Sequence, residues 1–250
     1  MPNFAVIIAA AGKSSRFGAS QPRDKKTFQE LRGRAVWLRS TEAFLNREDV
    51  KQVLVVLSPE DLEWFKDKYR ANLTFMAIDI VSGGAERVDS VQNALARVRS
   101  DIDFVAVHDA ARPLIANEWI TNVFDAAARS GAALLATRIA STVKRVDGDT
   151  IRETVPRANL WAAQTPQVFS RQLLMEAYAR RGDLTATDDA QLVEQLGHAV
   201  TVVEGSPLNF KITNREDMRM AEALMSLMPR DRPFDALQPS ADPKPKWLFS

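Results

Sequence analysis

Near its start the chain has an apolar run, residues 4–11, that leads directly into a turn of small residues at 12–18. A short apolar run rich in valine and isoleucine is typical of a strand buried on both faces of a parallel sheet. The turn contains glycine and serine, so backbone N–H groups can come close to an anion. Arg16, Lys25 and Lys26 follow the same strand. Because open α/β sheets bind ligands at the carboxyl ends of their strands, we predict a phosphate site here, with an ordinary turn on a basic surface as the alternative.

The spacing of this turn does not match two common phosphate loops. Gly12 and Gly18 bracket five residues, so the G-x-G-x-x-G of dinucleotide-binding proteins is missing. A G-x4-G-K-[S/T] loop is also missing. A dinucleotide-binding dehydrogenase is therefore disfavoured.

Apolar runs and amphipathic stretches alternate along the chain. The runs that predict buried strands are 53–57, 75–81, 104–108, 132–139 and 199–203. The stretches that predict helices are 35–45, 59–69, 86–98, 117–128, 171–180, 188–196 and 214–228. For the last helix we expect a capping box with Thr213 as the cap and Glu216 as its partner. The alternation implies βαβ units, so we expect an α/β fold with a Rossmann-like, doubly wound, mostly parallel sheet.

Two regions break this alternation. Residues 142–157 alternate with period two around Asp147-Gly148, which predicts a β-hairpin. A charged hairpin cannot stabilise itself, so we expect a projecting arm at about 140–160 that meets a second subunit or is an exposed excursion. Residues 229–250 contain five prolines and predict an extended or poorly ordered tail, after a single domain at 1–228.

Composition narrows the chemistry. The chain has no cysteine, which excludes disulfides, zinc–thiolate sites and cysteine nucleophiles. Its two histidines argue against a histidine-rich metal site, and a net charge of +1 gives no general attraction to nucleic acid. No apolar run has transmembrane length, and no basic residue precedes the first apolar run as in a signal peptide. We therefore expect a cytoplasmic protein that binds neither nucleic acid nor membrane.

A second glycine turn, residues 82–90, lies between a predicted strand and a predicted helix. Gly83 and Gly84 let the backbone approach a flat ligand without interference from Cβ atoms. Arg87 and Ser90 lie beside the buried stripe of the helix and can point toward the cleft. The alternative is a glycine turn with a solvated arginine.

The segment 107–113 ends the predicted strand 104–108. Asp109 at this strand end suits a Mg²⁺ ligand close to phosphate oxygens, with a helix cap as the alternative. Arg112 can pair with a further phosphate through its planar guanidinium. His108 is expected to be a packed, hydrogen-bonded residue without a chemical role.

Two later segments are also candidates. Residues 157–169 mix apolar anchors with an arginine, amides and a hydroxyl, which suits a polar ligand held against a packed wall or a strand entering the core. Lys211 lies just before the last helix, where a lysine opposes the helix dipole, so it either serves another anion or is solvated.

Six short motifs occur in one order along residues 4–225. They are Ala-Ala-Gly-x3-Arg, Gly-Gly-x-Glu-Arg-x-Asp-Ser-Val, His-Asp-Ala-Ala-Arg-Pro, Leu-Trp-x-x-Gln-Thr-Pro-Gln, Thr-Asp-Asp-Ala and Asn-x-Lys-Ile-Thr. Each is weak alone, but together the chain resembles the 2-C-methyl-D-erythritol 4-phosphate cytidylyltransferases of the non-mevalonate isoprenoid pathway. The resemblance implies that CTP and methylerythritol 4-phosphate give a CDP-alcohol and pyrophosphate, with Mg²⁺ or another divalent cation.

The resemblance also implies residue roles. Arg16 and Lys26 are expected to contact the triphosphate and stabilise the transition state, and Asp109 to bind the metal. The cytidine nucleotide is expected to lie against Ala10, Ala11, Gly12, Gly84, Arg87, Ser90 and Ala110. The sugar phosphate is expected to contact Arg112, Thr142, Arg157, Thr165 and Lys211. Thr142 and Arg157 are expected to reach across a homodimer from the arm.

Two departures from the family pattern leave questions open. The family usually has Pro-Lys after the first loop, whereas this chain has Lys25-Lys26 after a longer insert at 19–24. Either lysine can take the catalytic place, although Thr27-Phe28 favours Lys26. Ala85 stands where many members carry an acidic residue, which puts one contact to the base or ribose in doubt.

The implied chemistry suits a chain with few histidines. A phosphate monoester is largely dianionic at pH 7, so it can attack without a general base. Fixed cations and Mg²⁺ are then the main source of catalysis. The alternatives are a cytidylyltransferase for another polyol phosphate, such as ribitol 5-phosphate, and a nucleotide-binding regulator without catalysis.

Overall fold

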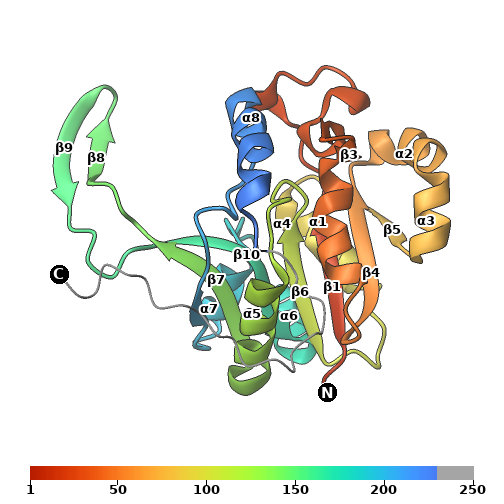
Figure 1. The fold of residues 1–250 in the computed structure, drawn as a ribbon. Coiled ribbons are helices and arrows are strands. Elements are labelled where there is room, and N and C mark those ends of the chain that lie inside the picture. The colour runs from red at the N-terminus through yellow and green to blue at the C-terminus, as the bar shows by residue number, and fades with distance from the viewer. Residues whose placement is uncertain (230–250) are drawn as a thin grey trace, which may run out of the picture.

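A seven-stranded sheet runs through the molecule in the order β11-β7-β10-β6-β1-β4-β5 (Figure 1). Its strands are β1 (Phe4–Ala9), β4 (Val50–Leu57), β5 (Asp79–Ser82), β6 (Phe104–Asp109), β7 (Ala132–Arg138), β10 (Trp161–Ser170) and β11 (Thr201–Glu204). β10 runs antiparallel to both neighbours, and the other pairs are parallel. The structure, a computed structural model, describes residues 1–229, so the predicted tail lies outside the described residues beyond Pro229.

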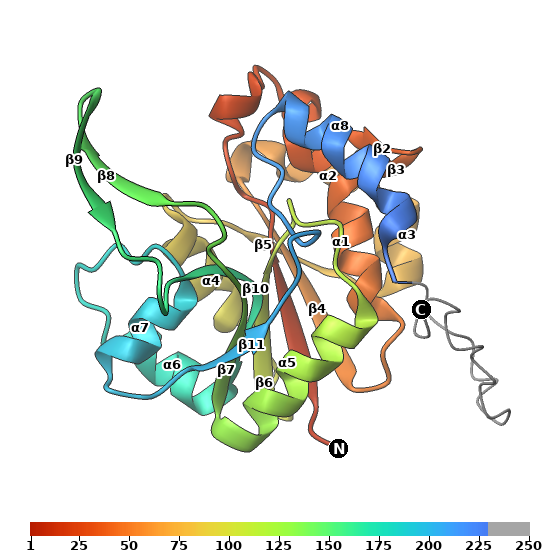
Figure 2. The ribbon, with the colours of Figure 1, turned by 60° about the vertical axis from the view of Figure 1, so that its left-hand side comes forward.

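Helices cover both faces of this sheet, as predicted for a doubly wound fold (Figure 2). One face carries α1 (Val36–Leu45), α2 (Leu62–Lys68) and α5 (Asn117–Ser130), and the other carries α4 (Arg87–Leu95), α6 (Arg171–Ala179) and α7 (Asp189–Gln195). Alternate residues of β1 enter the two cores, Val6 and Ile8 in the first and Ala5 and Ile7 in the second. A smaller apolar cluster packs α8 (Arg215–Leu224) against the loop after β1 and the short strand β2 (Glu30–Leu31), which pairs with β3 (Arg34–Ala35).

The strand order places a topological switch point beside β1. The chain passes from β1 to β4 and β5 on one side and then returns to β6 on the other side. At the carboxyl ends of the central strands, Ala9 is paired with Asp109. Ligands of open α/β sheets bind in the crevice at such a point.

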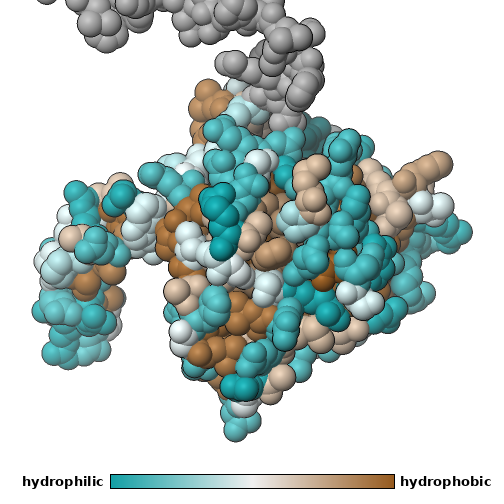
Figure 3. Space-filling model, turned by 90° about the horizontal axis from the view of Figure 1, so that it is seen from below, coloured by the Kyte–Doolittle hydropathy of each residue, from teal (hydrophilic) through white to brown (hydrophobic). Residues whose placement is uncertain are grey.

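The predicted hairpin is present and projects from the body of the molecule (Figures 1 and 3). It consists of β8 (Val143–Asp147) and β9 (Thr150–Val155). Its turn lies at Gly148-Asp149, one residue later than predicted, because Gly148 takes the positive φ of 56° that the turn needs. Val146 and Ile151 on this arm are each 58% exposed.

Two details of the predicted elements are wrong, and one open alternative is decided. Phe75 and Met76 belong to the helix α3 (Arg70–Met76) and not to a strand, because a short apolar run does not distinguish helix from strand. α8 is capped one residue later than predicted, by Asn214 with Asp217 as its partner. For residues 161–170 the strand alternative is correct, since they form β10 and enter the core. Within residues 1–229, no helix combines the length and apolarity needed to cross a bilayer.

Candidate active site

The carboxylate of Asp109, at the end of β6, is surrounded by cations from three segments. Lys211 Nζ lies 3.0 Å from Oδ2, Arg112 Nε lies 3.4 Å from the same oxygen, and Arg87 Nε lies 3.8 Å from Oδ1. Asp109 itself is 7% exposed. The fold therefore gathers residues separated by more than a hundred positions at the switch point between β1 and β6.

These cations determine the charge of Asp109. Burial by itself would raise the pKa of the carboxyl group, but Lys211, Arg87 and Arg112 outweigh burial and lower the pKa well below its usual range. Asp109 is therefore an anion at any physiological pH. Cations outnumber carboxylates in this cluster, and a site with net positive charge attracts phosphate groups.

The loop after β1 brings further positive charge to this cluster. Burial, followed by the charge of Lys211, lowers the pKa of Lys26 to about 8, with a smaller contribution from Arg16. Arg16 is exposed and lies in the short helical turn of residues 15–17. Both predicted catalytic residues thus lie at the same end of the sheet as Asp109.

The structure distinguishes the two adjacent lysines. Lys25 is buried and ion-paired with Asp61, so its ammonium faces the protein interior. Lys26 is half-buried and lies in the electrostatic environment of Asp109 and Lys211. Of the two, Lys26 therefore belongs to the cluster.

Gly12 and Gly84 differ in whether the surrounding protein requires a glycine at that position. A Cβ at Gly12 would meet no atom within 4 Å, so no protein contact requires a glycine there and the backbone is open to a ligand. A Cβ at Gly84 would meet Asp89 at 2.4 Å, so Gly84 is required by the close approach of its loop to α4. Ser90 Oγ accepts a hydrogen bond from Gly84 N at 3.0 Å and holds that loop in place, while Ala85 is exposed.

Thr165, on β10, contacts the carboxyl end of β6 through its hydroxyl group. Its Oγ1 accepts a hydrogen bond from the backbone N–H of Asp109 at 3.0 Å and lies 3.1 Å from His108 Nδ1. Burial lowers the pKa of His108 to about 4, so the ring is neutral at physiological pH. As predicted, His108 is a packed and hydrogen-bonded residue.

The other predicted residues divide into two groups. Ala10 and Ala110 are buried beside the central strand ends, and Ala11 is partly buried there. Thr142 and Arg157 flank the arm and are exposed. Within residues 1–229, no side-chain hydrogen bond or ion pair joins either of these two residues to the Asp109 cluster. One chain alone therefore does not bring the arm residues into the site.

Sequence reasoning missed a buried contact behind Arg87. Arg87 Nη2 lies 2.7 Å from Asp189 Oδ2, and Tyr178 donates to Asp189 Oδ1 at 2.6 Å. Asp189 is fully buried and holds the guanidinium beside Asp109. Its only signal in the sequence is its place in the Thr-Asp-Asp-Ala motif, to which no role could be assigned.

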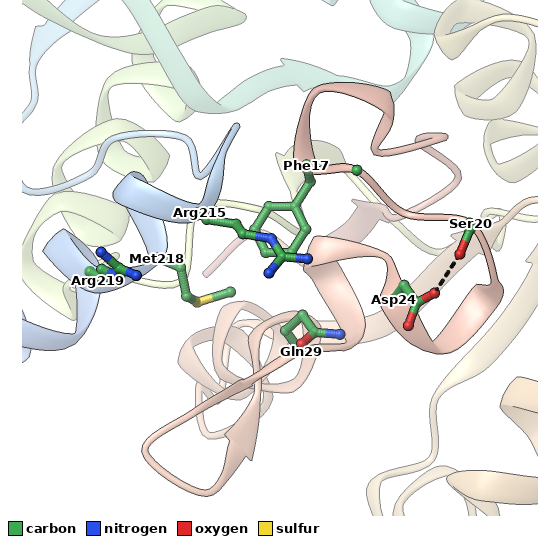
Figure 4. A pocket seen from close by; sticks show the side chains of 8 residues that line it. Phe17, Ser20, Asp24, Gln29, Arg215, Met218 and Arg219 are labelled. Carbon is green, nitrogen blue, oxygen red and sulfur yellow. Dashed lines mark hydrogen bonds between the residues drawn. The ribbon is translucent and has the colours of Figure 1, made fainter.

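A cavity of about 470 Å³ lies between the loop after β1 and α8 (Figure 4). Arg215 reaches over the ring of Phe17, with 5.9 Å between its guanidinium carbon and the ring centroid. Asp24 and Ser20 are hydrogen-bonded on its other side. None of the predicted site residues lines this cavity, so it is separate from the Asp109 cluster.

The Asp109 cluster offers a metal ion one carboxylate. Within the described residues, no group of three or more histidine or acidic side chains can enclose a cation. Asp109 supplies one ionised carboxylate at the strand end. Mg²⁺ is commonly held by one or two carboxylates together with substrate phosphates and water, so the residues fit Mg²⁺ only as a partner of phosphate.

Comparison with known proteins agrees with this geometry. A family model described as 2-C-methyl-D-erythritol 4-phosphate cytidylyltransferase matches residues 4–227. Proteins of that name from Endomicrobium trichonymphae and Rhodopirellula baltica are 44% and 41% identical to this chain, covering 88% of it in each case and 98% and 94% of the relatives. A crystal structure of the protein of that name from Thermus thermophilus is 34% identical, with a TM-score of 0.73, and covers 90% of this chain and 98% of its own. This chain belongs to the 2-C-methyl-D-erythritol 4-phosphate cytidylyltransferase family.

Proposed function

We propose that this enzyme transfers a cytidylyl group from CTP to 2-C-methyl-D-erythritol 4-phosphate, releasing pyrophosphate in isoprenoid biosynthesis. The observation that carries the proposal is the group of cations around Asp109 at the switch point between β1 and β6. A reaction between two anionic phosphates needs such a group, because the main barrier is their mutual repulsion. Relatives and solved structures of the same family support the choice of substrates.

The reaction can proceed with very little movement of protons. A phosphate oxygen of methylerythritol 4-phosphate attacks the α-phosphorus of CTP and forms a new P–O bond. The bond from the α-phosphorus to the bridging oxygen breaks, and pyrophosphate leaves with the electron pair. Since the attacking group is already largely dianionic at pH 7, no general base is needed. The neutral, buried His108 is consistent with this requirement.

Four of the cations have distinct roles in this reaction. Arg16 and Lys26, on the loop after β1, bind the triphosphate and stabilise the charge that develops on the leaving pyrophosphate. Lys211 and Arg112, which both lie at Asp109 Oδ2, hold the sugar phosphate for attack. The open backbone at Gly12 and the loop at Gly84 receive the cytidine. Asp109 would hold Mg²⁺, which would supply additional charge neutralisation for the phosphates.

One assay separates this function from its alternatives. Pyrophosphate release is measured with each nucleoside triphosphate, with and without each polyol phosphate. We expect release only with CTP and methylerythritol 4-phosphate together. Activity with ribitol 5-phosphate instead would support the other polyol specificity, and CTP binding without release under any condition would support a regulator.

We also propose that the arm makes the enzyme a homodimer in which each site is completed by Thr142 and Arg157 from the other subunit. The exposed apolar residues Val146 and Ile151 on a projecting hairpin favour contact with a second chain.

The shared site predicts rescue between two inactive variants. Lys26→Ala removes a residue of the body and Arg157→Ala removes a residue of the arm, so a hybrid dimer retains one intact site. After the two variants are unfolded and refolded together, we expect about a quarter of wild-type activity, because about half of the dimers are hybrids. Separate variants refolded alone serve as controls. A mixture no more active than its components contradicts the shared site.

The lowered pKa of Lys26 predicts that CTP binding weakens at high pH. Below pH 8 the ammonium is charged and attracts the triphosphate, whereas above pH 8 the free enzyme loses this proton and must regain it on binding. The dissociation constant of CTP is therefore expected to rise up to about tenfold per pH unit above 8. Titration calorimetry between pH 7 and 9.5 in buffers of different ionisation enthalpy measures both affinity and proton uptake. Lys26→Arg should bind CTP without this rise, because arginine stays charged.

A further inference from the structure

Lys25 forms a buried ion pair that the reaction itself does not use. Its Nζ lies 2.6 Å from Asp61 Oδ2, 2.9 Å from Ser58 Oγ and 3.2 Å from Glu60 Oε1. Lys25 is 7% exposed and Asp61 is fully buried. The pair joins the loop after β1 to residues 58–61, which follow β4. Buried charges of this kind are retained only when they are closely paired, so the contact constrains both segments.

The backbone conformation at Lys25 links this ion pair to the position of Lys26. Lys25 has φ −61° and ψ 136°, an extended conformation close to polyproline II, in which successive side chains leave the backbone in different directions. Lys25 thus points inward to Asp61, and Lys26 points to the cluster around Asp109. The backbone N–H of Lys26 also donates to Ser14 Oγ at 3.3 Å, which ties the two ends of the loop together.

A second anchor lies on the other side of Lys26. Phe28 is buried, with its ring centroid 5.3 Å from that of Trp64 and 5.5 Å from that of Phe65. Both partners belong to α2, which directly follows Asp61. Lys26 is therefore held between two contacts to one rigid unit, residues 58–65. By contrast, residues 18–24 of the same loop are not buried.

We infer that Lys25 is a positioning residue whose buried pair with Asp61 holds Lys26 at the distance from the triphosphate that the transition state requires. The inference rests on the proposed function of Lys26. Catalytic charges act only when they are held in place before the reaction, and small displacements reduce the rate more than they reduce binding. Loss of the pair should therefore lower kcat more than it changes either KM.

The test uses a double variant, Lys25→Met with Asp61→Asn. Removing both charges avoids an unpaired buried carboxylate, which could unfold Lys25→Met alone. The matched control is Arg47→Met with Asp49→Asn, a half-buried pair at 2.7 Å just before β4, at the opposite end of this strand from residues 58–61. Lys25→Arg, which can still pair with Asp61, is the conservative variant. For each protein, kcat, both KM values and the thermal unfolding temperature are measured.

We expect the double variant to lose about ten- to hundredfold in kcat, with both KM values within about twofold of wild type. Lys25→Arg should retain most of the wild-type kcat. The control variant, Arg47→Met with Asp49→Asn, should keep the wild-type kcat even if its unfolding temperature falls. A folded double variant with wild-type kcat overturns the inference. The inference is also overturned if the double variant and the control variant lose the same stability and the same kcat.

A readout independent of activity separates this inference from the proposed function. Trypsin can cut after Arg23 and Lys26 in both the double variant and the control, and the rate of these two cuts in the native protein reports how firmly the segment is held. Cleavage should be faster in the double variant than in the control pair at equal unfolding temperature. Equal cleavage rates overturn the inference. A wild-type protein without cytidylyltransferase activity overturns the proposed function. In that case the cleavage rates still show whether the Lys25–Asp61 pair holds this segment in place.

Discussion

Replacing Lys26 with alanine is expected to lower kcat by about 10² to 10³, and replacing Arg16 with alanine by a similar factor, by analogy with the loss of one preorganised donor to a developing anion. Both groups neutralise charge on the triphosphate as pyrophosphate leaves. Arg16 is exposed and Lys26 is half-buried, so neither variant should lose much stability. Steady-state kinetics with saturating CTP and methylerythritol 4-phosphate, together with thermal unfolding, measure both effects.

Two controls make this result specific. Lys51→Ala removes an exposed lysine on β4, outside the cluster, and should leave kcat unchanged. Lys26→Arg keeps the charge and should retain more activity than Lys26→Ala, although a guanidinium does not reproduce the geometry of an ammonium. If both alanine variants turn over at near-normal rates, the chemistry lies elsewhere in the molecule.

Asp109→Asn is expected to lower kcat by about 10² to 10³, as strongly as the alanine variants of Lys26 and Arg16. It should also raise the Mg²⁺ concentration needed for half-maximal rate. Asparagine preserves the size of the side chain and the hydrogen bond from the backbone N–H of residue 109 to Thr165. It removes the negative charge that Lys211, Arg112 and Arg87 surround. Measuring the rate as a function of Mg²⁺ concentration separates loss of metal binding from loss of turnover.

The control for this variant is Asp101→Asn, an exposed aspartate that pairs with Arg99 away from the site. It should leave the Mg²⁺ dependence unchanged. If Asp109→Asn shows the same Mg²⁺ dependence as wild type, Asp109 is not the metal ligand, and its role is limited to ordering the surrounding cations.

The amino-acid sequence was sufficient for the general architecture. Alternating apolar and amphipathic stretches predicted the doubly wound sheet, because burial on both faces leaves a pattern along the chain. Period-two alternation around Gly148 predicted the arm for a similar reason. The same reasoning failed at 75–81, where an apolar run is shared between α3 and β5, and at the cap of α8, where Thr213 and Asn214 are both capping residue types.

Local sequence alone thus determined which residue types lie at the strand ends, since short-range pattern and turn chemistry are local properties. Only the tertiary structure decided which of them meet. Strand order brought Asp109, Arg87 and Lys211 together from distant segments, and the buried carboxylate of Asp61 decided that Lys25 faces inward and Lys26 toward the cluster. Two adjacent lysines are equivalent in sequence, and they become different only when one of them finds a buried partner 36 residues away.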